Sequence, residues 1–173
     1  MCSSDLWVGV QFTKAVNLPG NTGYRDGKVF DAGNRSSAPG DVIRVGSFGI
    51  GTRGKNFVGT VELVNEHFPT EPVILNLHIS TAIYKTYDPN QVPAIIEECK
   101  KRANPNVTLN ISNETYMEDR MELSAWLNKN DINIFCDRDD IVRFAESTCT
   151  DHAMMARKPL GITSNSKFKH LAD

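Results

Sequence analysis

Beginning near Asp41, short apolar runs alternate with longer amphipathic segments, and this alternation constrains the fold more than any other feature of the sequence. Short runs rich in β-branched residues and bounded by turn-forming residues are typical of strands. The pattern predicts strands at Val42–Phe48, Val73–Ile79, Val107–Ile111, Ile132–Cys136 and Pro159–Thr163, with strand starts near Ile43, Val73, Val107, Ile132 and Leu160.

The segments between these runs are predicted to be helices. In the first of them, Phe57, Val61 and Val64 recur at near-helical spacing, which indicates one apolar face. Strands that alternate with helices favour right-handed βαβ units and a parallel sheet. We therefore predict an α/β domain from residue 41 to 173, a parallel sheet with crossover helices. The predicted helices are Lys55–His67, Val92–Ala103, Met117–Lys129 and a segment from Ala145 or Glu146 to Arg157.

Residues 1–40 differ from the rest of the chain in their pattern of apolar and turn-forming residues. A short apolar run, Trp7–Phe12, is followed by turn-forming stretches such as Pro19–Asn21 and Asp31–Asn34. Such runs indicate short strands, hairpins and loops. Ser36–Asp41, which contains a Pro-Gly pair, has the composition of a linker. We therefore expect residues 1–40 to form an irregular N-terminal arm and linker.

Composition narrows the function classes only a little. The 173 residues are 40% hydrophobic with a formal net charge of −2, which gives no electrostatic reason to expect nucleic acid as a partner. No apolar run approaches the roughly 18 residues that a transmembrane helix needs. The N-terminus lacks the basic-then-apolar pattern of a signal peptide, so we expect a cytoplasmic protein.

The four cysteines are Cys2, Cys99, Cys136 and Cys149, and no two of them have the CxxC spacing of a zinc or redox motif. Cys136 ends an apolar run and Cys149 lies in a predicted helix. We therefore expect these two to be buried free thiols, and we predict no metal site.

The strongest local feature is a glycine-rich turn, Gly46-Ser-Phe-Gly-Ile-Gly-Thr-Arg-Gly-Lys55, that opens onto the first predicted helix. Glycines let the backbone approach a ligand closely, and the amides at a helix N-terminus attract anions. Arg53 and Lys55 add charges suited to a diphosphate, and we expect both side chains to face solvent. The same sequence also suits a tight strand-to-helix connection that binds nothing.

A second candidate feature, Glu146-Ser-Thr148, precedes the last predicted helix. Ser147 or Thr148 can cap that helix. Because the helix N-terminus is expected to face the same sheet edge, these residues can alternatively hold a phosphate oxygen. Asp151 and His152, one turn further on, suit either ribose hydroxyls or a solvated surface.

Two further features allow both a structural and a functional interpretation. His78 lies inside an apolar strand, where a hydrogen-bonded core histidine is more common than a ligand. The acidic cluster Asp137-Arg-Asp-Asp140 follows the fourth predicted strand. Such a run is more often a solvated loop than a site for a metal or a substrate hydroxyl.

Three stretches together resemble the C-terminal half of a GT-B glycosyltransferase of the group 1 (family 4) type: Gly46–Phe57, Asn130–Phe135 and Ala153–Leu160. The last stretch resembles the family's "AMACGKPV"-like motif. The resemblance, which covers about residues 42–171, implies a Rossmann-like domain that binds a nucleotide-diphosphate-sugar. It places the diphosphate against Gly49, Gly51, Arg53 and Lys55.

The resemblance also implies which parts are missing. The family has two glutamates eight residues apart before its motif, whereas this chain has Phe144 and His152 there, and Asp151 is the nearest carboxylate to the second position. Ser147 and Thr148 fit the small residues that contact the phosphates. Residues 1–40 are too few for the acceptor domain, so they would be a remnant of it. The chain also ends before the family's sixth strand and closing helices.

The sequence therefore predicts the donor-binding portion of a glycosyltransferase, inactive by itself, that needs no cofactor beyond its sugar donor. The acceptor and the catalytic residues are unknown. The alternative is a non-catalytic Rossmann-like binding or assembly module. The predicted ligand-binding residues are Gly49, Gly51, Arg53, Lys55, Ser147, Thr148 and Asp151.

Overall fold

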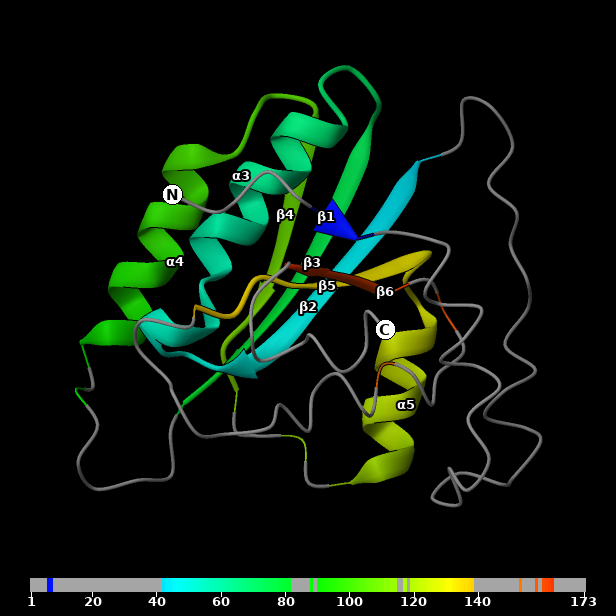
Figure 1. Ribbon diagram of the computed structural model, residues 1–173. Helices are drawn as coiled ribbons and strands as arrows, with labels where there is room; N and C mark the ends of the chain where they lie inside the picture. The colour runs from blue at the N-terminus through cyan, green and yellow to red at the C-terminus, as the bar shows by residue number, and fades with distance from the viewer. Residues whose placement is uncertain are drawn as a thin grey trace.

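A computed structural model describes residues 6–7, 42–81, 88, 90–114, 117, 119–138, 153, 158 and 160–163. These residues contain a six-stranded sheet with the order β1-β6-β5-β2-β3-β4 (Figure 1). The strands are β1 Leu6–Trp7, β2 Ile43–Ile50, β3 Val73–Ser80, β4 Val107–Ser112, β5 Ile132–Phe135 and β6 Leu160–Thr163.

The five strands from β2 to β6 are all parallel, which confirms the predicted α/β fold. Taken in chain order, these five lie as 3-2-1-4-5, the order of a Rossmann-like sheet. Each begins at the residue predicted from the sequence. Within residues 1–40, Leu6 and Trp7 are described, and they add an antiparallel edge strand that pairs with Thr163 and Ile162 of β6.

Three α-helices are described: α3 Phe57–His67, α4 Gln91–Arg102 and α5 Arg120–Asn128. Two of them, α3 and α5, begin later than predicted because a polar side chain caps the start of each. Asn56 adopts a left-handed conformation with φ of 51°, and its side chain accepts a hydrogen bond from the Gly59 amide. Asp119 accepts from the Met121 amide at 2.7 Å. Apart from Ala153, which is helical, the last predicted helix lies outside the described residues.

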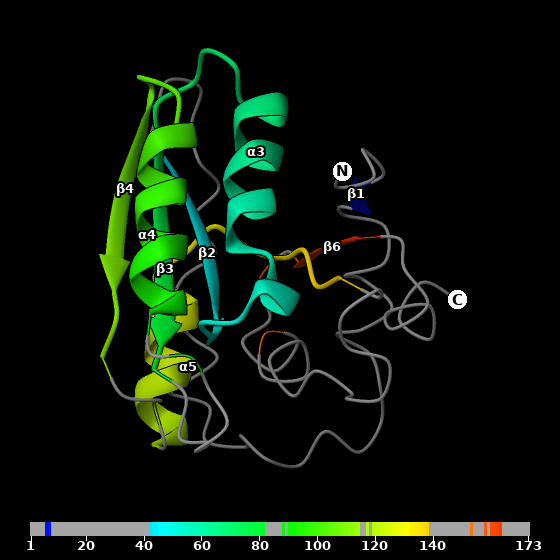
Figure 2. The ribbon, with the colours of Figure 1, turned by 90° about the vertical axis from the view of Figure 1, so that its left-hand side faces the viewer.

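The sheet separates the apolar core into two clusters, one on each face, and helices cover both clusters. α3 and α4 lie side by side and bury the larger cluster, which includes Val45, Leu75 and Ile134 (Figures 1 and 2). α5 packs on the other face, where Leu127 contacts a cluster that includes Phe48. Because side chains alternate along a strand, β2 contributes Val45 to one cluster and Phe48 to the other.

Both described cysteines, Cys99 and Cys136, are buried thiols, and burial was predicted for Cys136. Cys2 and Cys149 lie outside the described residues. In the described part of the chain, no helix has the length and apolarity needed to cross a membrane.

A row of asparagine amides crosses the sheet on the face covered by α5. Asn110 donates to Asn76 at 2.9 Å, Asn76 donates to Asn130 at 2.8 Å, and Asn130 donates to Asn133 at 2.9 Å. The row passes over Gly46 of β2, which lies in register with Asn76 and Asn133. A Cβ at Gly46 would lie 2.0 Å from Asn130 Nδ2, so this crossing requires glycine. We call Asn110, Asn76, Asn130 and Asn133 the asparagine row.

Candidate functional site

The strand order reverses between β2 and β5, which are hydrogen-bonded neighbours although they lie far apart in the chain. In open parallel sheets, ligands bind outside the carboxyl ends of the strands at such a point. The glycine-rich turn follows β2, and the segment that begins with Cys136 follows β5. Both segments therefore meet at the edge where the fold favours a ligand.

The glycine-rich turn is anchored to β3. Gly49 and Ile50 belong to β2 rather than to the turn, because the strand extends two residues beyond the predicted Phe48. The Gly51 amide donates to the Ser80 carbonyl at 2.8 Å, and the Ser80 hydroxyl donates to the Gly49 carbonyl at 3.1 Å. A Cβ at Gly51 would lie 2.4 Å from Val92 Cγ2. Close packing against α4 thus accounts for glycine at position 51 without a ligand.

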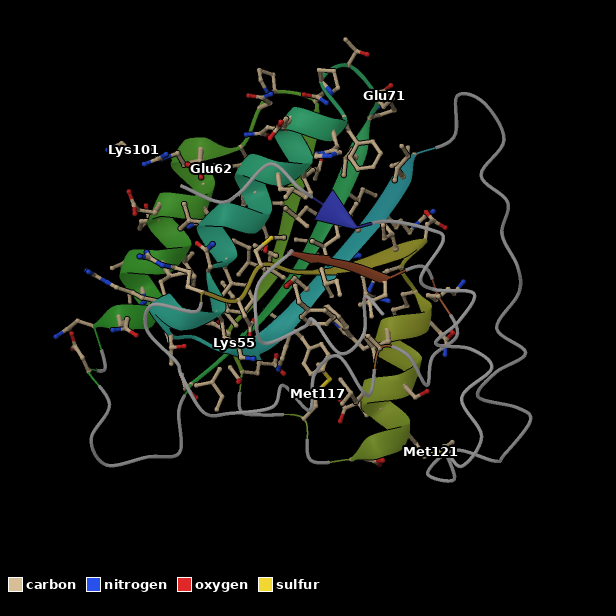
Figure 3. The ribbon with its side chains drawn as sticks, viewed as in Figure 1. Lys55, Glu62, Glu71, Lys101, Met117 and Met121 are labelled. Atoms are coloured by element: carbon tan, nitrogen blue, oxygen red, sulfur yellow. The ribbon has the colours of Figure 1, made fainter. Side chains whose placement is uncertain are left out.

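Arg53 and Lys55 lie on a single 3-10 turn, Arg53–Lys55, but differ in environment. The Arg53 side chain is exposed, as predicted, while its backbone amide donates to Gln91 Oε1 at 3.3 Å. Lys55 Nζ lies 2.9 Å from Asp137 Oδ2, and the two side chains are only 18% and 2% exposed. The prediction that Lys55 faces solvent is wrong, because its ammonium pairs with this buried carboxylate. Figure 3 shows Lys55 beside the carboxyl end of β2.

Two further hydrogen bonds join the turn to the segment after β5. Asn56 Nδ2 donates to the Cys136 carbonyl at 3.1 Å, and the Arg138 amide donates to the Gly54 carbonyl at 2.8 Å. The acidic cluster after β5 is therefore not simply a solvated loop, because its first carboxylate, Asp137, is buried against the turn. Sequence reasoning treated the two segments separately, since it did not establish that β2 and β5 are neighbours.

The sheet edge between β2 and β5 carries exposed arginines and lies beside the N-terminus of α3, which Asn56 caps. Arg53 and Arg138 have exposed side chains on the two joined segments. The Gly59 amide of α3 donates to Asn56 Oδ1, so this amide already has a hydrogen-bond partner within the chain. The described residues contain no group of three or more histidines, cysteines or carboxylates that could hold a metal ion.

The remaining sequence candidates divide into two groups. Ser147, Thr148 and Asp151 lie outside the described residues, so their placement at this edge stays a prediction. His78 is buried, with Nδ1 2.8 Å from the Ser112 hydroxyl and its ring edge-on to Trp126. This environment favours the core-histidine interpretation.

Comparison with known proteins does not extend the assignment. No protein-family model matches the chain, and a comparison with curated proteins finds no match. The fold therefore defines the class, a Rossmann-like α/β domain whose parallel strands have the order 3-2-1-4-5. The likeness to glycosyltransferases rests on the residues quoted above.

Proposed function

We propose that the chain binds a nucleotide-diphosphate-sugar at the sheet edge between β2 and β5, as the donor-binding portion of a glycosyltransferase. One observation carries the proposal: the basic glycine-rich turn and the segment after β5 meet where the strand order reverses. The resemblance supplies the ligand class, and the exposed Arg53 supplies a matching charge.

In this proposal, Arg53 contacts the diphosphate directly, because a guanidinium can donate two parallel hydrogen bonds to phosphate oxygens. Asp137 holds Lys55 at the edge through their 2.9 Å ion pair, so that the ammonium lies close to the negative charge of the diphosphate. The two cations would stabilise the nucleoside diphosphate as it leaves the sugar. Catalysis would additionally require the acceptor-side domain.

A second candidate is a non-catalytic binding or assembly module. The Lys55–Asp137 ion pair favours it, because an ammonium already paired with a buried carboxylate does not need a phosphate. The capping of α3 by Asn56 favours it in the same way.

Calorimetric titration with UDP, GDP and their sugars distinguishes the two candidates. The donor-binding proposal expects saturable binding of at least one nucleotide or nucleotide-sugar and no sugar transfer by this chain alone. Absence of binding to the entire set would overturn the proposal and leave the binding or assembly module.

A further inference from the structure

β4 forms one edge of the sheet, and in the described part of the chain it pairs only with β3 (Figure 2). No charged residue occurs between Arg102 and Glu114. Thr108 and Asn110 are exposed on the strand. Edge strands are normally protected from pairing with other chains by charges, prolines or bulges. β4 has neither a charge nor a proline within its six residues, which makes it suitable for pairing with another strand.

The backbone of β4 offers hydrogen-bonding groups to such a partner. The Asn106 carbonyl accepts from the Val73 amide at 3.0 Å, so this carbonyl points toward β3. Backbone groups of successive strand residues point to opposite sides, so those of Leu109 and Ile111 point away from β3. Val107 has the same orientation, but its amide already donates to the Asn104 carbonyl at 2.9 Å.

The asparagine row ends at this edge. Asn110 Nδ2 donates to Asn76 Oδ1, and the row continues from there into the sheet. An asparagine amide has two donor hydrogens and one acceptor oxygen. Within the described residues, one donor and the acceptor of Asn110 are therefore available to a partner. An identical amide provides the complementary donor and acceptor.

We propose that β4 pairs antiparallel with β4 of a second copy of this chain, about a twofold axis at Asn110. Directly opposite residues of an antiparallel pair lie on the same face, so the two Asn110 amides meet across the axis. This register exchanges backbone hydrogen bonds between Leu109 of one copy and Ile111 of the other. It also pairs Thr108 with Ser112, which places two hydroxyls opposite each other.

The charges on the neighbouring helix are compatible with this arrangement. The exposed surface of α4 carries Glu97 and Glu98 together with Lys100 and Lys101. A twofold axis places identical surfaces together, so a patch of one sign would repel its copy, whereas mixed signs allow opposite charges to meet. The sheets of the two copies would join into one, with the edges that carry Arg53 facing opposite directions.

The test measures the mass of the 173-residue chain by sedimentation and light scattering over a wide concentration range. Wild type is expected to reach twice the 19.2 kDa of one chain. Asn110→Lys and Asn110→Asp should each be monomeric, because like charges would meet at the axis. An equimolar mixture of these two variants should recover the dimer. Met121→Lys, an exposed substitution on α5, should dimerise like wild type.

A measurement on wild type alone makes the test independent of the folding of the variants. Hydrogen exchange of the Leu109 and Ile111 amides should be slow at high protein concentration and faster on dilution. A wild-type chain that stays monomeric, with exchange independent of concentration, would overturn the proposal. A dimer that persists in both charged variants would place the interface elsewhere and would also overturn it.

Discussion

The ammonium of Lys55, at the end of the turn after β2, lies 2.9 Å from the carboxylate of Asp137, which follows β5. The two residues are 82 positions apart in the chain. Their ion pair therefore ties together the two segments that form the proposed ligand-binding edge. Because the Asp137 side chain is only 2% exposed, the pair is shielded from water more than a surface salt bridge.

Replacing the lysine should destabilise the fold. Lys55→Met keeps the apolar stem but removes the charge that compensates Asp137. Removing one partner of a buried pair typically costs about 3–5 kcal/mol, and we expect about 2–3 kcal/mol here because the Lys55 side chain remains 18% exposed. Urea denaturation measures the loss. Lys101→Met, at an exposed site on α4, is the control, and equal unfolding midpoints for both variants would contradict the prediction.

Replacing Arg53 should weaken nucleotide binding without affecting the fold. A charged hydrogen bond to phosphate contributes about 1.5–3 kcal/mol, so Arg53→Ala should lower the affinity roughly tenfold to a hundredfold. Its urea midpoint should match wild type, because the side chain is exposed. Calorimetry on wild type, Arg53→Ala and the control Lys101→Ala provides the comparison. Unchanged affinity in Arg53→Ala would remove Arg53 from the site.

Gly46→Ala should destabilise the sheet through a specific collision. The added Cβ would lie 2.0 Å from Asn130 Nδ2 and 2.6 Å from Asn133 Oδ1, so the asparagine row would have to move. We expect a loss of about 2–4 kcal/mol from overpacking and broken buried hydrogen bonds. Asn130→Ala removes the closest colliding group, so the double variant should lose less than the sum of the single losses. Strict additivity in urea denaturation would argue against the collision.

Cys99 should resist thiol reagents in the folded protein. Burial, with a smaller contribution from the nearby Glu98 charge, raises the pKa of the Cys99 thiol from 9.0 to about 12. The reactive thiolate is therefore scarce at pH 8. Maleimide labelling followed by peptide mapping should find Cys99 unmodified in native protein and modified in denaturant. Rapid labelling of native protein would contradict this environment.

The raised pKa of Cys99 also predicts how the free energy of unfolding depends on pH. The folded state keeps the Cys99 proton up to a pKa of about 12, whereas the unfolded chain releases it near 9.0. The stabilising contribution is therefore complete below pH 9 and declines as pH rises from 9 toward 12. Urea midpoints measured from pH 8 to pH 10.5 should fall more steeply for wild type than for Cys99→Ala. Parallel curves would show that Cys99 does not contribute.

The strand starts were predictable from two patterns. The four residues of β5 are all buried in an apolar run, whereas the edge strand β4 alternates apolar and polar residues, and the sequence displays both patterns directly. Helix starts were less accurate. The apolar periodicity that begins at Phe57 does not reveal that Asn56 adopts a left-handed conformation and caps the helix. Similarly, Asp119 caps α5, which begins at Arg120, three residues after the predicted start at Met117. Apolar periodicity reports which face is buried, whereas a cap depends on the conformation of one residue.

The sequence by itself determined the α/β class, the parallel strands and the basic glycine-rich turn, because these follow from local patterns of apolar, glycine and charged residues. Only the tertiary structure decided that β2 and β5 are neighbours, and therefore that Lys55 pairs with Asp137 while Arg53 stays exposed. It also decided that Gly46 lies beneath the asparagine row. The physical reason is that strand order brings together residues that are distant in the chain, and local periodicity contains no record of that order.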